Sequence, residues 1–150
     1  MPTLSLHTPV GDITLCEDEG QLVAVEWGWG SDQDETPLLL EARDQLNAYF
    51  DGTLEQFNLP LAPYGTPRRL QIWQAMQAIP YGQTKTYGQL AAELGTSAQA
   101  VGQACAHNPL PLFIPCHRVL SATPGRDNYS FGEGVETKAM LLSLEGAVEV

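Results

Sequence analysis

Apolar and polar residues roughly alternate along the first part of the chain, from residue 3 to residue 29. The clearest run is residues 22–27, and turn-forming residues stand at positions 10–12 and 19–20. Alternation with a period of two, interrupted by such turns, is typical of short strands. We therefore predict a strand-rich beginning of the chain.

Helical spacing follows. Leu40, Leu46 and Phe50 predict a helix over residues 37–50, which Asp51 and Gly52 end. Residues 60–65 combine turn formers with a change in charge density, so we interpret them as a linker. This organisation divides the chain into an N-terminal α/β domain, residues 1–64, and a second domain, residues 65–150.

Capping residues mark helix starts in the second domain. Thr66 and Ser97 can each cap a helix, and Thr86 with Gln89 forms a capping box. The expected apolar face of the first helix is Leu70, Trp73, Met76, Ala78 and Ile79. The capping box begins a short helix that runs to residue 94, and a second helix covers residues 97–107. Two helices joined by a tight turn predict a helix-turn-helix.

Apolar content predicts the elements of the rest of this domain, from residue 110 onward. Residues 110–119 are mostly apolar and are expected to be a strand or an extended segment. Residues 121–134 resemble a loop, and residues 136–144 a closing helix. The predicted fold class is α/β, with a strand-rich lobe followed by a helical lobe.

Composition narrows the class of protein. Of the 150 residues, 43% are hydrophobic and 17% are charged, which excludes a disordered chain. The first residues lack the pattern of a signal peptide, and no stretch approaches the length of a membrane span, so we expect a cytoplasmic protein without membrane partners. The three cysteines, Cys16, Cys105 and Cys116, form neither a disulfide framework nor a CxxC metal site.

The net charge of −11 is unevenly distributed. Residues 1–67 hold twelve acidic residues and Arg43 as their one basic residue, whereas residues 68–150 hold six of each sign. The acidity therefore belongs to the first half. The second half can still bind a polyanion, although its charge favours only weak binding.

Cys116 and His117 are the strongest candidates for chemistry. They end an apolar segment bracketed by prolines, which presents a thiol rigidly beside a base. An imidazole can activate a thiol by taking its proton, because the thiolate is the nucleophile. An isolated Cys-His pair is more often a buried small residue beside a polar surface residue, so the pair alone does not establish catalysis.

The surrounding sequence adds to this evidence. Residues 115–119, Pro-Cys-His-Arg-Val, preceded by Asn-Pro-Leu-Pro at 108–111, resemble the active-site signature of the O6-alkylguanine-DNA alkyltransferases. Further matches in the same order lie at residues 79–82, 86–91, 100–104 and 141–146. The resemblance runs from about residue 66 to 146. It implies a ribonuclease H-like first lobe and a winged helix-turn-helix second lobe.

The resemblance also implies a catalytic set. Cys116 would accept the alkyl group, and His117, linked to the thiol through a water and oriented by Glu145, would remove its proton. Asn108 would brace the active-site turn. Tyr87 would donate a proton to the leaving guanine and help to swing the nucleotide out of the duplex. The reaction implied is a single transfer to the protein itself, with no cofactor. Because His7 and His107 have no matching ligand set in the sequence, we expect no metal site, although the first lobe of some family members can hold a structural zinc.

The same resemblance implies how DNA is held. The helix over residues 97–107 would enter the minor groove of a duplex whose O6-alkylguanine is flipped out. The expected substrate-binding residues are Tyr87, Gln99, Ala100, Gly102, Arg118, Tyr129, Ser130 and Phe131.

Two of these positions depart from the family pattern. Gln99 stands where the family has an arginine that fills the gap left by the flipped base, and Phe131 stands where many members have glycine. We expect Phe131 to narrow the pocket for large alkyl groups. The helix over residues 97–107 also holds no Lys or Arg, which favours weak DNA binding.

The predicted function is DNA repair by a monomeric, stoichiometric alkyltransferase that acts on O6-alkylguanine, with O4-alkylthymine as a further candidate substrate. Two alternatives stay open. One keeps the cysteine chemistry but uses a substrate other than DNA, as Gln99 and the uncharged helix suggest. The other is a non-catalytic protein that binds alkylated guanine, against which the presence of Cys116 argues.

Overall fold

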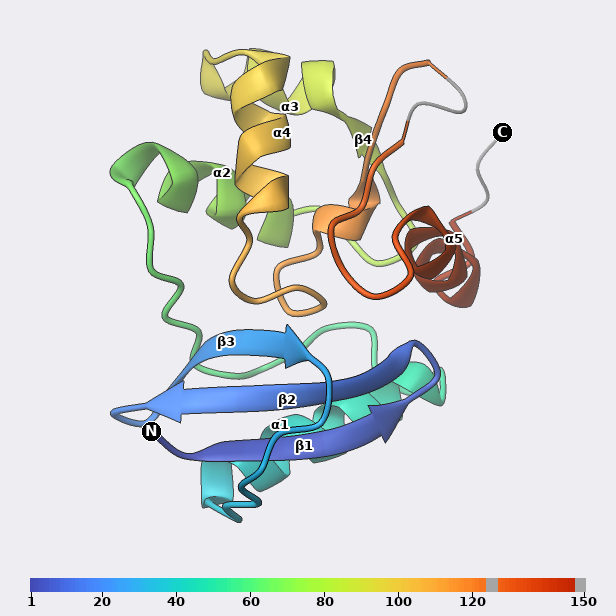
Figure 1. Ribbon diagram of the computed structural model, residues 1–150. Helices are drawn as coiled ribbons and strands as arrows, with labels where there is room; N and C mark the ends of the chain where they lie inside the picture. Colours follow the sequence, from blue (N-terminus) through green and yellow to red (C-terminus); the bar gives the residue numbers. More distant parts are fainter. Residues whose placement is uncertain (124–126, 148–150) are drawn as a thin grey trace. The chain divides into compact units, whose positions relative to one another are not determined.

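The chain folds as two units, Met1–Tyr64 and Gly65–Val150. The computed structural model describes residues 1–123 and 127–147 (Figure 1). In the first unit, strands β1 (Thr3–Thr8), β2 (Gly11–Asp18) and β3 (Gln21–Trp27) form an antiparallel sheet in the order β1-β2-β3. The alternating pattern therefore correctly predicted strands.

Helix α1 (Pro37–Phe50) covers one face of this sheet (Figure 1). Thr36 caps it, since its hydroxyl accepts a hydrogen bond from the backbone N–H of Leu39 at 3.1 Å. The buried side chains of the helix are Leu39, Ala42, Leu46 and Tyr49. They pack on strand residues such as Ile13 and Leu15, which are fully buried, and this apolar layer is the core of the unit.

The predicted linker is partly tied to the sheet. Leu61 forms a bridge beside Leu22 of β3, with the Leu22 N–H donating to Pro60 and the Ala62 N–H donating to Leu22. These backbone hydrogen bonds tie the first residues of the predicted linker to β3.

The second unit is mainly helical. Its elements are α2 (Pro67–Gln77), β4 (Lys85–Thr86), α3 (Tyr87–Leu94), α4 (Ala98–Ala106), the 3-10 turn η1 (Cys116–Arg118), β5 (Val119–Leu120) and α5 (Val135–Leu144). The predicted caps of Thr66 and Ser97 are present, and so is the capping box of Thr86 and Gln89. Gly95 ends α3 with a φ of 67°, a left-handed conformation that suits glycine.

The apolar face predicted for α2 needs a correction. Leu70 and Ala78 are exposed, and Ile72 is buried instead, beside Trp73 and Met76. The helix turns this face toward α4, where the indole N–H of Trp73 donates to the carbonyl of Ala104 at 2.8 Å. A buried hydrogen bond between the two helices thus fixes their register.

The segment predicted as a strand or an extended segment is not a continuous strand. Residues 110–118 form turns, with a bridge between Pro111 and Ile114 followed by η1, and only Val119 and Leu120 pair with β4. Three prolines at 109, 111 and 115 lack the N–H that a strand ladder requires. Residues 121–123 and 127–134 carry no helix or strand, and positions 124–126 of the predicted loop lie outside the described residues.

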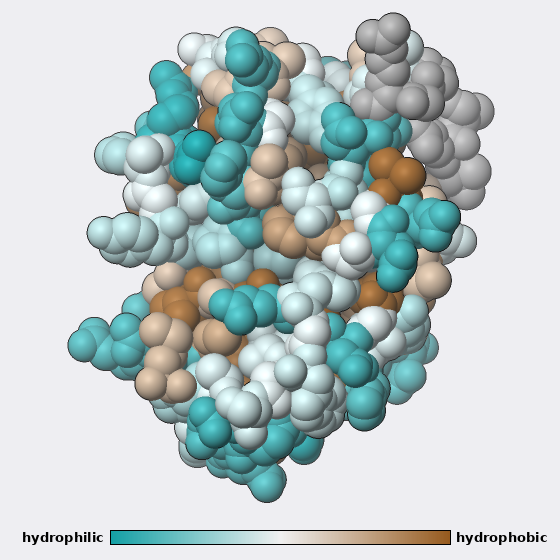
Figure 2. All heavy atoms as spheres, in the orientation of Figure 1, coloured by the Kyte–Doolittle hydropathy of each residue, from teal (hydrophilic) through white to brown (hydrophobic). Residues whose placement is uncertain are grey.

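In Figure 2, the visible surface of the Met1–Tyr64 unit carries hydrophilic side chains in teal beside pale ones and a smaller group of hydrophobic ones in brown. In residues 1–123 and 127–147, no helix is both long and apolar enough to cross a bilayer. The same part of the chain contains no group of three or more His, Cys, Asp or Glu residues that could hold a metal ion.

Candidate active site around Cys116

Asn108 fixes the turn that presents Cys116. Its side-chain N–H donates to the carbonyl of Ile114 at 2.8 Å, and its side-chain oxygen accepts from the N–H of Leu110 at 2.9 Å. One buried amide therefore closes both ends of the loop. Leu112 between them has a φ of 78°, a conformation that is strained for a branched side chain and needs such bracing.

Below Cys116 lies a buried ionic network. The Nε2 of His117 lies 2.7 Å from Oε2 of Glu145, and Arg118 donates to both carboxylate oxygens, from Nε at 2.8 Å and from Nη2 at 3.0 Å. Arg118 also donates to the carbonyl of Ile79 at 2.7 Å. Because a carboxylate only accepts hydrogen bonds, Glu145 holds His117 in the tautomer that carries its proton on Nε2.

That tautomer leaves Nδ1 of His117 as the basic nitrogen. Nδ1 is buried and has no hydrogen-bond partner in the described part of the chain. Burial lowers the pKa of His117, although the hydrogen bond to Glu145 opposes this shift. The imidazole is therefore neutral at pH 7 and is able to accept a proton.

The thiol of Cys116 is 2% exposed. Burial raises its pKa to about 11, while hydrogen bonding from Asn108 and the charge of Lys138 act in the opposite direction. The group is a thiol at neutral pH. It needs a base at the moment of reaction, and His117 follows it directly in η1.

A second buried cation, Lys138 on α5, was missed by the sequence analysis. Its ammonium donates to the carbonyl of Val119 at 2.7 Å and to that of Asn128 at 3.2 Å, and it lies 3.6 Å from the carboxylate of Asp127. It also lies 5.6 Å from the ring centroid of Tyr87. Lys138 thus ties β5 and the following loop to the aromatic ring at the site.

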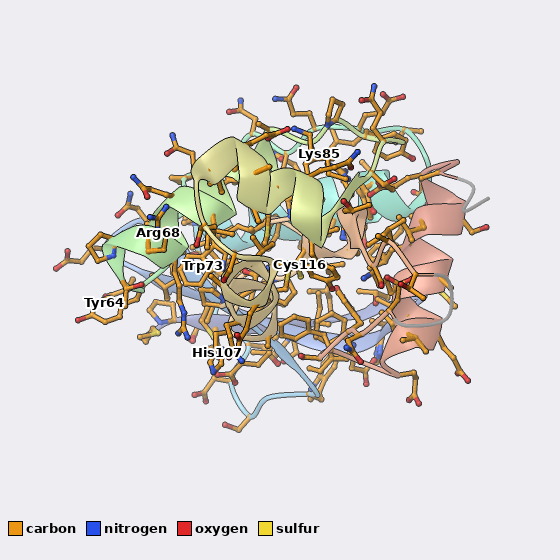
Figure 3. All side chains as sticks on the ribbon, turned by 90° about the horizontal axis from the view of Figure 1, so that it is seen from above. Tyr64, Arg68, Trp73, Lys85, His107 and Cys116 are labelled. Atoms are coloured by element: carbon orange, nitrogen blue, oxygen red, sulfur yellow. The ribbon has the colours of Figure 1, made fainter. Side chains whose placement is uncertain are left out.

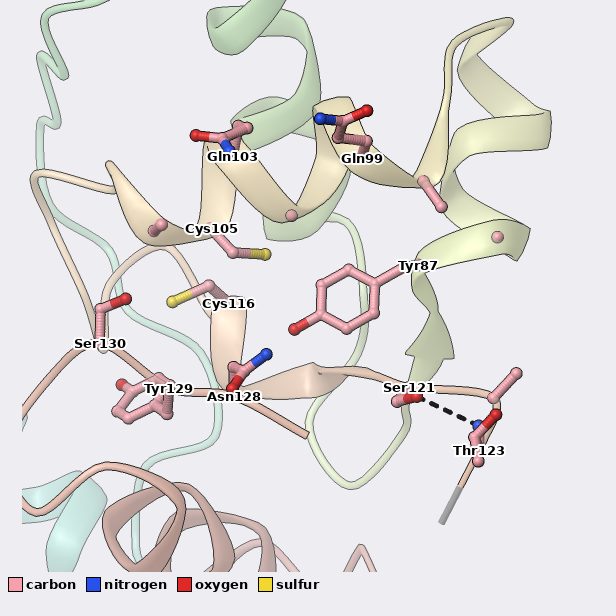
Figure 4. A pocket seen from close by; sticks show the side chains of 15 residues that line it. Tyr87, Gln99, Gln103, Cys105, Cys116, Ser121, Thr123, Asn128, Tyr129 and Ser130 are labelled. Atoms are coloured by element: carbon pink, nitrogen blue, oxygen red, sulfur yellow. Dashed lines mark hydrogen bonds between the residues drawn. The ribbon is translucent and has the colours of Figure 1, made fainter. Parts of the chain in front are cut away.

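A cavity of about 840 Å³ opens above Cys116 (Figure 4). Its lining comes from α4, from the start of α3 and from the two loop segments after β5; these residues are Tyr87, Gly88, Ala98, Gln99, Gly102, Gln103, Cys105, Ala106, Cys116, Ser121, Ala122, Thr123, Asn128, Tyr129 and Ser130. The aromatic ring of Tyr87 points into the cavity (Figure 4). Burial raises the pKa of its phenol, which is therefore protonated at neutral pH.

Five of the predicted substrate-binding residues line this cavity: Tyr87, Gln99, Gly102, Tyr129 and Ser130. Three others do not. The N–H of Ala100 donates to the hydroxyl of Ser97, which caps α4. Arg118 is buried in the ionic network, which makes it a structural partner of Glu145. Phe131 packs edge-on against Tyr129, with ring centroids 5.2 Å apart, so the cavity wall at this point is Tyr129.

The cavity also contains a second thiol. Cys105 on α4 lines it together with Cys116. Burial is the main cause that raises the pKa of the Cys105 thiol, and the nearby Cys116 raises it further. The sequence analysis gave Cys105 no place in the candidate site. The helical spacing of the lining residues 98, 102 and 105 is the signal that could have placed it on the cavity side of α4.

Family models match both units. One, described as the 6-O-methylguanine DNA methyltransferase DNA binding domain, covers residues 67–147, and another, described as the ribonuclease-like domain of the same proteins, covers residues 4–63.

Known proteins are similar over almost the whole length. The constitutive methylated-DNA–protein-cysteine methyltransferase of Bacillus subtilis is 38% identical, covering 93% of this chain and 92% of that protein. A protein of the same name from Methanosarcina acetivorans is 39% identical, covering 94% and 96%.

Solved structures agree. The O6-methylguanine methyltransferase of Mycobacterium tuberculosis has a TM-score of 0.85 at 32% identity, covering 99% of this chain and 94% of that one. A structure from the same organism in complex with DNA has a TM-score of 0.83 at 34% identity, covering 97% and 92%.

Proposed function

The chain belongs to the 6-O-methylguanine DNA methyltransferase family, and from this membership and its active-site geometry we propose that it repairs DNA by moving a methyl or small alkyl group from O6-alkylguanine onto Cys116. The observation that carries the proposal is the buried thiol beside a neutral imidazole that a carboxylate orients. This arrangement is that of an activated cysteine nucleophile.

The reaction begins with removal of the thiol proton. Nδ1 of His117 takes this proton from Cys116 through a bridging water, and Glu145 stabilises the imidazolium that forms. Because the pKa of Cys116 is raised to about 11, the thiolate forms only as the reaction proceeds. The buried pair of Arg118 and Glu145 keeps the base in place throughout.

The thiolate then displaces guanine at the alkyl carbon. A sulfur–carbon bond forms as the bond between that carbon and O6 breaks, and the bonding electron pair stays on guanine. Tyr87 gives its phenolic proton to the leaving base, and the proton first taken from Cys116 restores the phenol. The products are guanine and an S-alkylcysteine, and since the thioether is stable, each molecule acts once.

The partner is double-stranded DNA with the alkylated nucleotide flipped into the cavity above Cys116. Flipping is required because O6 inside a base stack cannot meet a protein thiol. We propose that the protein acts as a monomer in the cytoplasm. The two alternatives, a substrate other than DNA and a non-catalytic binding role, are not favoured by the relatives, which are named methylated-DNA–protein-cysteine methyltransferases.

Intact-mass spectrometry tests the proposal. The protein is incubated with a duplex that contains O6-methylguanine, and a mass gain of one methyl group in exchange for one hydrogen is expected on Cys116. Cys116→Ala should abolish the gain and still bind the alkylated duplex. Cys16→Ala, which removes a thiol from the sheet of the other unit, is the matched control and should transfer normally.

Cys105 is the critical comparison, because it lies in the same cavity. Cys105→Ala should still gain the methyl group, because it leaves the proposed acceptor Cys116 and its neighbour His117 intact. A methyl group found on Cys105 of the unaltered protein would contradict the choice of nucleophile.

A further inference from the structure

Two glutamines stand on the outer side of α4. Gln99 and Gln103 are four residues apart, so they share one face of the helix, and both are exposed at the rim of the Cys116 cavity. Figure 4 shows both side chains on the same side of α4, pointing away from Cys116. Neither side-chain amide has a hydrogen-bond partner among the described residues.

The two faces of α4 differ in what they contact. Val101 and Ala104 are fully buried, and Ala104 accepts the hydrogen bond from Trp73. On the outer side, a methyl group added at Gly102 would meet nothing within 4 Å. Packing inside the protein therefore does not require a small residue at 102, and the space beside this glycine is open.

We infer that Gln103, acting with Gln99, binds the edges of base pairs in the minor groove beside the flipped nucleotide. This inference rests on the proposed function, because it takes duplex DNA as the partner. The proposal extends the expected role of Gln99 to a second residue. It assigns Gln103 to positioning the duplex over the cavity.

The chemistry of the primary amide fits this groove. Every base pair presents acceptors there, on N3 of purines and O2 of pyrimidines, and a G·C pair adds the N2 amino donor. A glutamine amide both donates and accepts, so it can bond to any of these edges. A repair protein meets its lesion in every sequence context, and a contact indifferent to sequence suits that task.

The spacing of the two residues also suits a duplex. Four helical residues rise about 6 Å, which is close to two base-pair steps of about 3.4 Å each along one strand. With Gln99 at the gap left by the flipped base, Gln103 reaches the edge of a neighbouring intact pair. Because α4 carries no charged side chain, these neutral contacts are the polar contacts that it offers.

The test measures the dissociation constant for duplexes that contain O6-methylguanine, in the Cys116→Ala background so that no transfer occurs. The adenines within two base pairs of the lesion are compared with 3-deazaadenine, in which the N3 acceptor is a C–H group. Gln103→Ala should weaken binding to the adenine duplex about fivefold, the value of one ordinary hydrogen bond. In this variant 3-deazaadenine should cause no further loss.

Gln74→Ala, which removes the same amide from the exposed surface of α2, is the matched control and should bind like its parent. The inference is wrong if Gln103→Ala binds as tightly as its parent, or if 3-deazaadenine weakens both proteins equally. Failure of the proposed function would look different: the unaltered protein would gain no methyl group on Cys116 from the duplex or from free O6-methylguanosine.

Discussion

The two sides of the Cys116 cavity are built on opposite principles. Beneath the thiol, His117, Arg118, Glu145 and Lys138 are charged or titratable groups that are buried and bonded to one another or to backbone carbonyls. Across the cavity, α4 has no charged residue, and its amides are exposed and unbonded. Fixed charges in a medium of low dielectric constant orient a proton acceptor, whereas a neutral, shallow helix face can approach DNA closely.

Most basic side chains of the Gly65–Val150 unit also have partners within the protein. Arg118 and Lys138 face inward, Lys85 pairs with Glu93 at 2.6 Å, and Arg68 donates to the last turn of α3. In Figure 3, Cys116 lies inside the unit while Lys85 lies at its edge. Since the described basic side chains mostly have partners within the protein, DNA binding should depend only weakly on salt.

The largest effect is expected from disrupting the buried ionic network beneath Cys116. Glu145→Gln keeps the shape of the side chain but leaves the guanidinium of Arg118 buried without a counter-charge, which should lower the free energy of unfolding by about 3 kcal/mol. The amide can also donate to Nε2 of His117 and favour the wrong tautomer, so methyl transfer should slow at least about 10²-fold. Urea denaturation and single-turnover kinetics measure the two effects.

An exposed ion pair provides the control. Glu93→Gln removes the same charge from the partner of Lys85, where a surface pair contributes at most about 1 kcal/mol. Equal losses of stability in Glu93→Gln and Glu145→Gln would mean that the interior network has no special role in the fold.

Acidification should affect the two sides differently. Burial lowers the pKa of His117, so the imidazole is protonated only below the usual value of about 6.5. The transfer rate should be flat from pH 7 to 9 and should fall about tenfold per unit only below the lowered pKa. Duplex binding through the uncharged α4 should stay constant over the same acid limb.

The free energy of unfolding should also decrease on acidification. Between the lowered pKa of folded His117 and about 6.5, the unfolded chain binds a proton that the folded protein does not, so stability falls as the pH drops through this window. A transfer rate that rises tenfold per unit from pH 7 to 9 would instead indicate that Cys116 ionises directly to solvent. That result would remove His117 from the mechanism.

Local signals explain what the sequence could predict of the fold. The caps of α2, α3 and α4 are hydrogen bonds between residues three apart, so Thr66, Thr86 and Ser97 were recognisable in advance. For residues 110–119 a strand was one of the two predicted conformations, because their apolar content resembles a strand, and it is wrong over residues 110–118. The conformation of this segment depends on the three prolines and on the amide of Asn108, whose bonds cross the loop.

The same distinction applies to the site. Cys116 and His117 are adjacent, so the pair was recognisable as a candidate thiol and base, and the surrounding family motifs turned this candidate into a predicted active site. The partnership of His117 with Glu145 spans 28 residues and followed only from the family resemblance. Arg118 was assigned to substrate binding from the resemblance, and nothing local indicated its burial. Lys138 was missed, although its spacing from Leu141 and Leu142 puts a lysine on the buried face of α5.

The smallest effect should come from adding a charge to the neutral side. Gln99→Arg replaces an amide with a longer cation that can stack in the gap left by the flipped base and neutralise one phosphate. The slope of log affinity against log salt should steepen by about one unit. Duplex binding should tighten a few-fold at low salt, and the transfer rate on duplex should rise relative to the rate on free O6-methylguanosine, which makes no groove contact.

Fluorescence anisotropy across a salt series, with single-turnover rates on both substrates, measures this change. Gln74→Arg, on the exposed surface of α2, adds the same charge away from the cavity and controls for general attraction to DNA. Two results together would contradict this expectation: Gln99→Arg leaves duplex repair unchanged or slower, and Gln74→Arg steepens the salt slope as much as Gln99→Arg does. Position 99 would then contact the DNA no more closely than position 74. Gln99 would then belong to a different mode of binding, and the contrast between a charged interior and a neutral DNA-facing helix would lose its functional meaning.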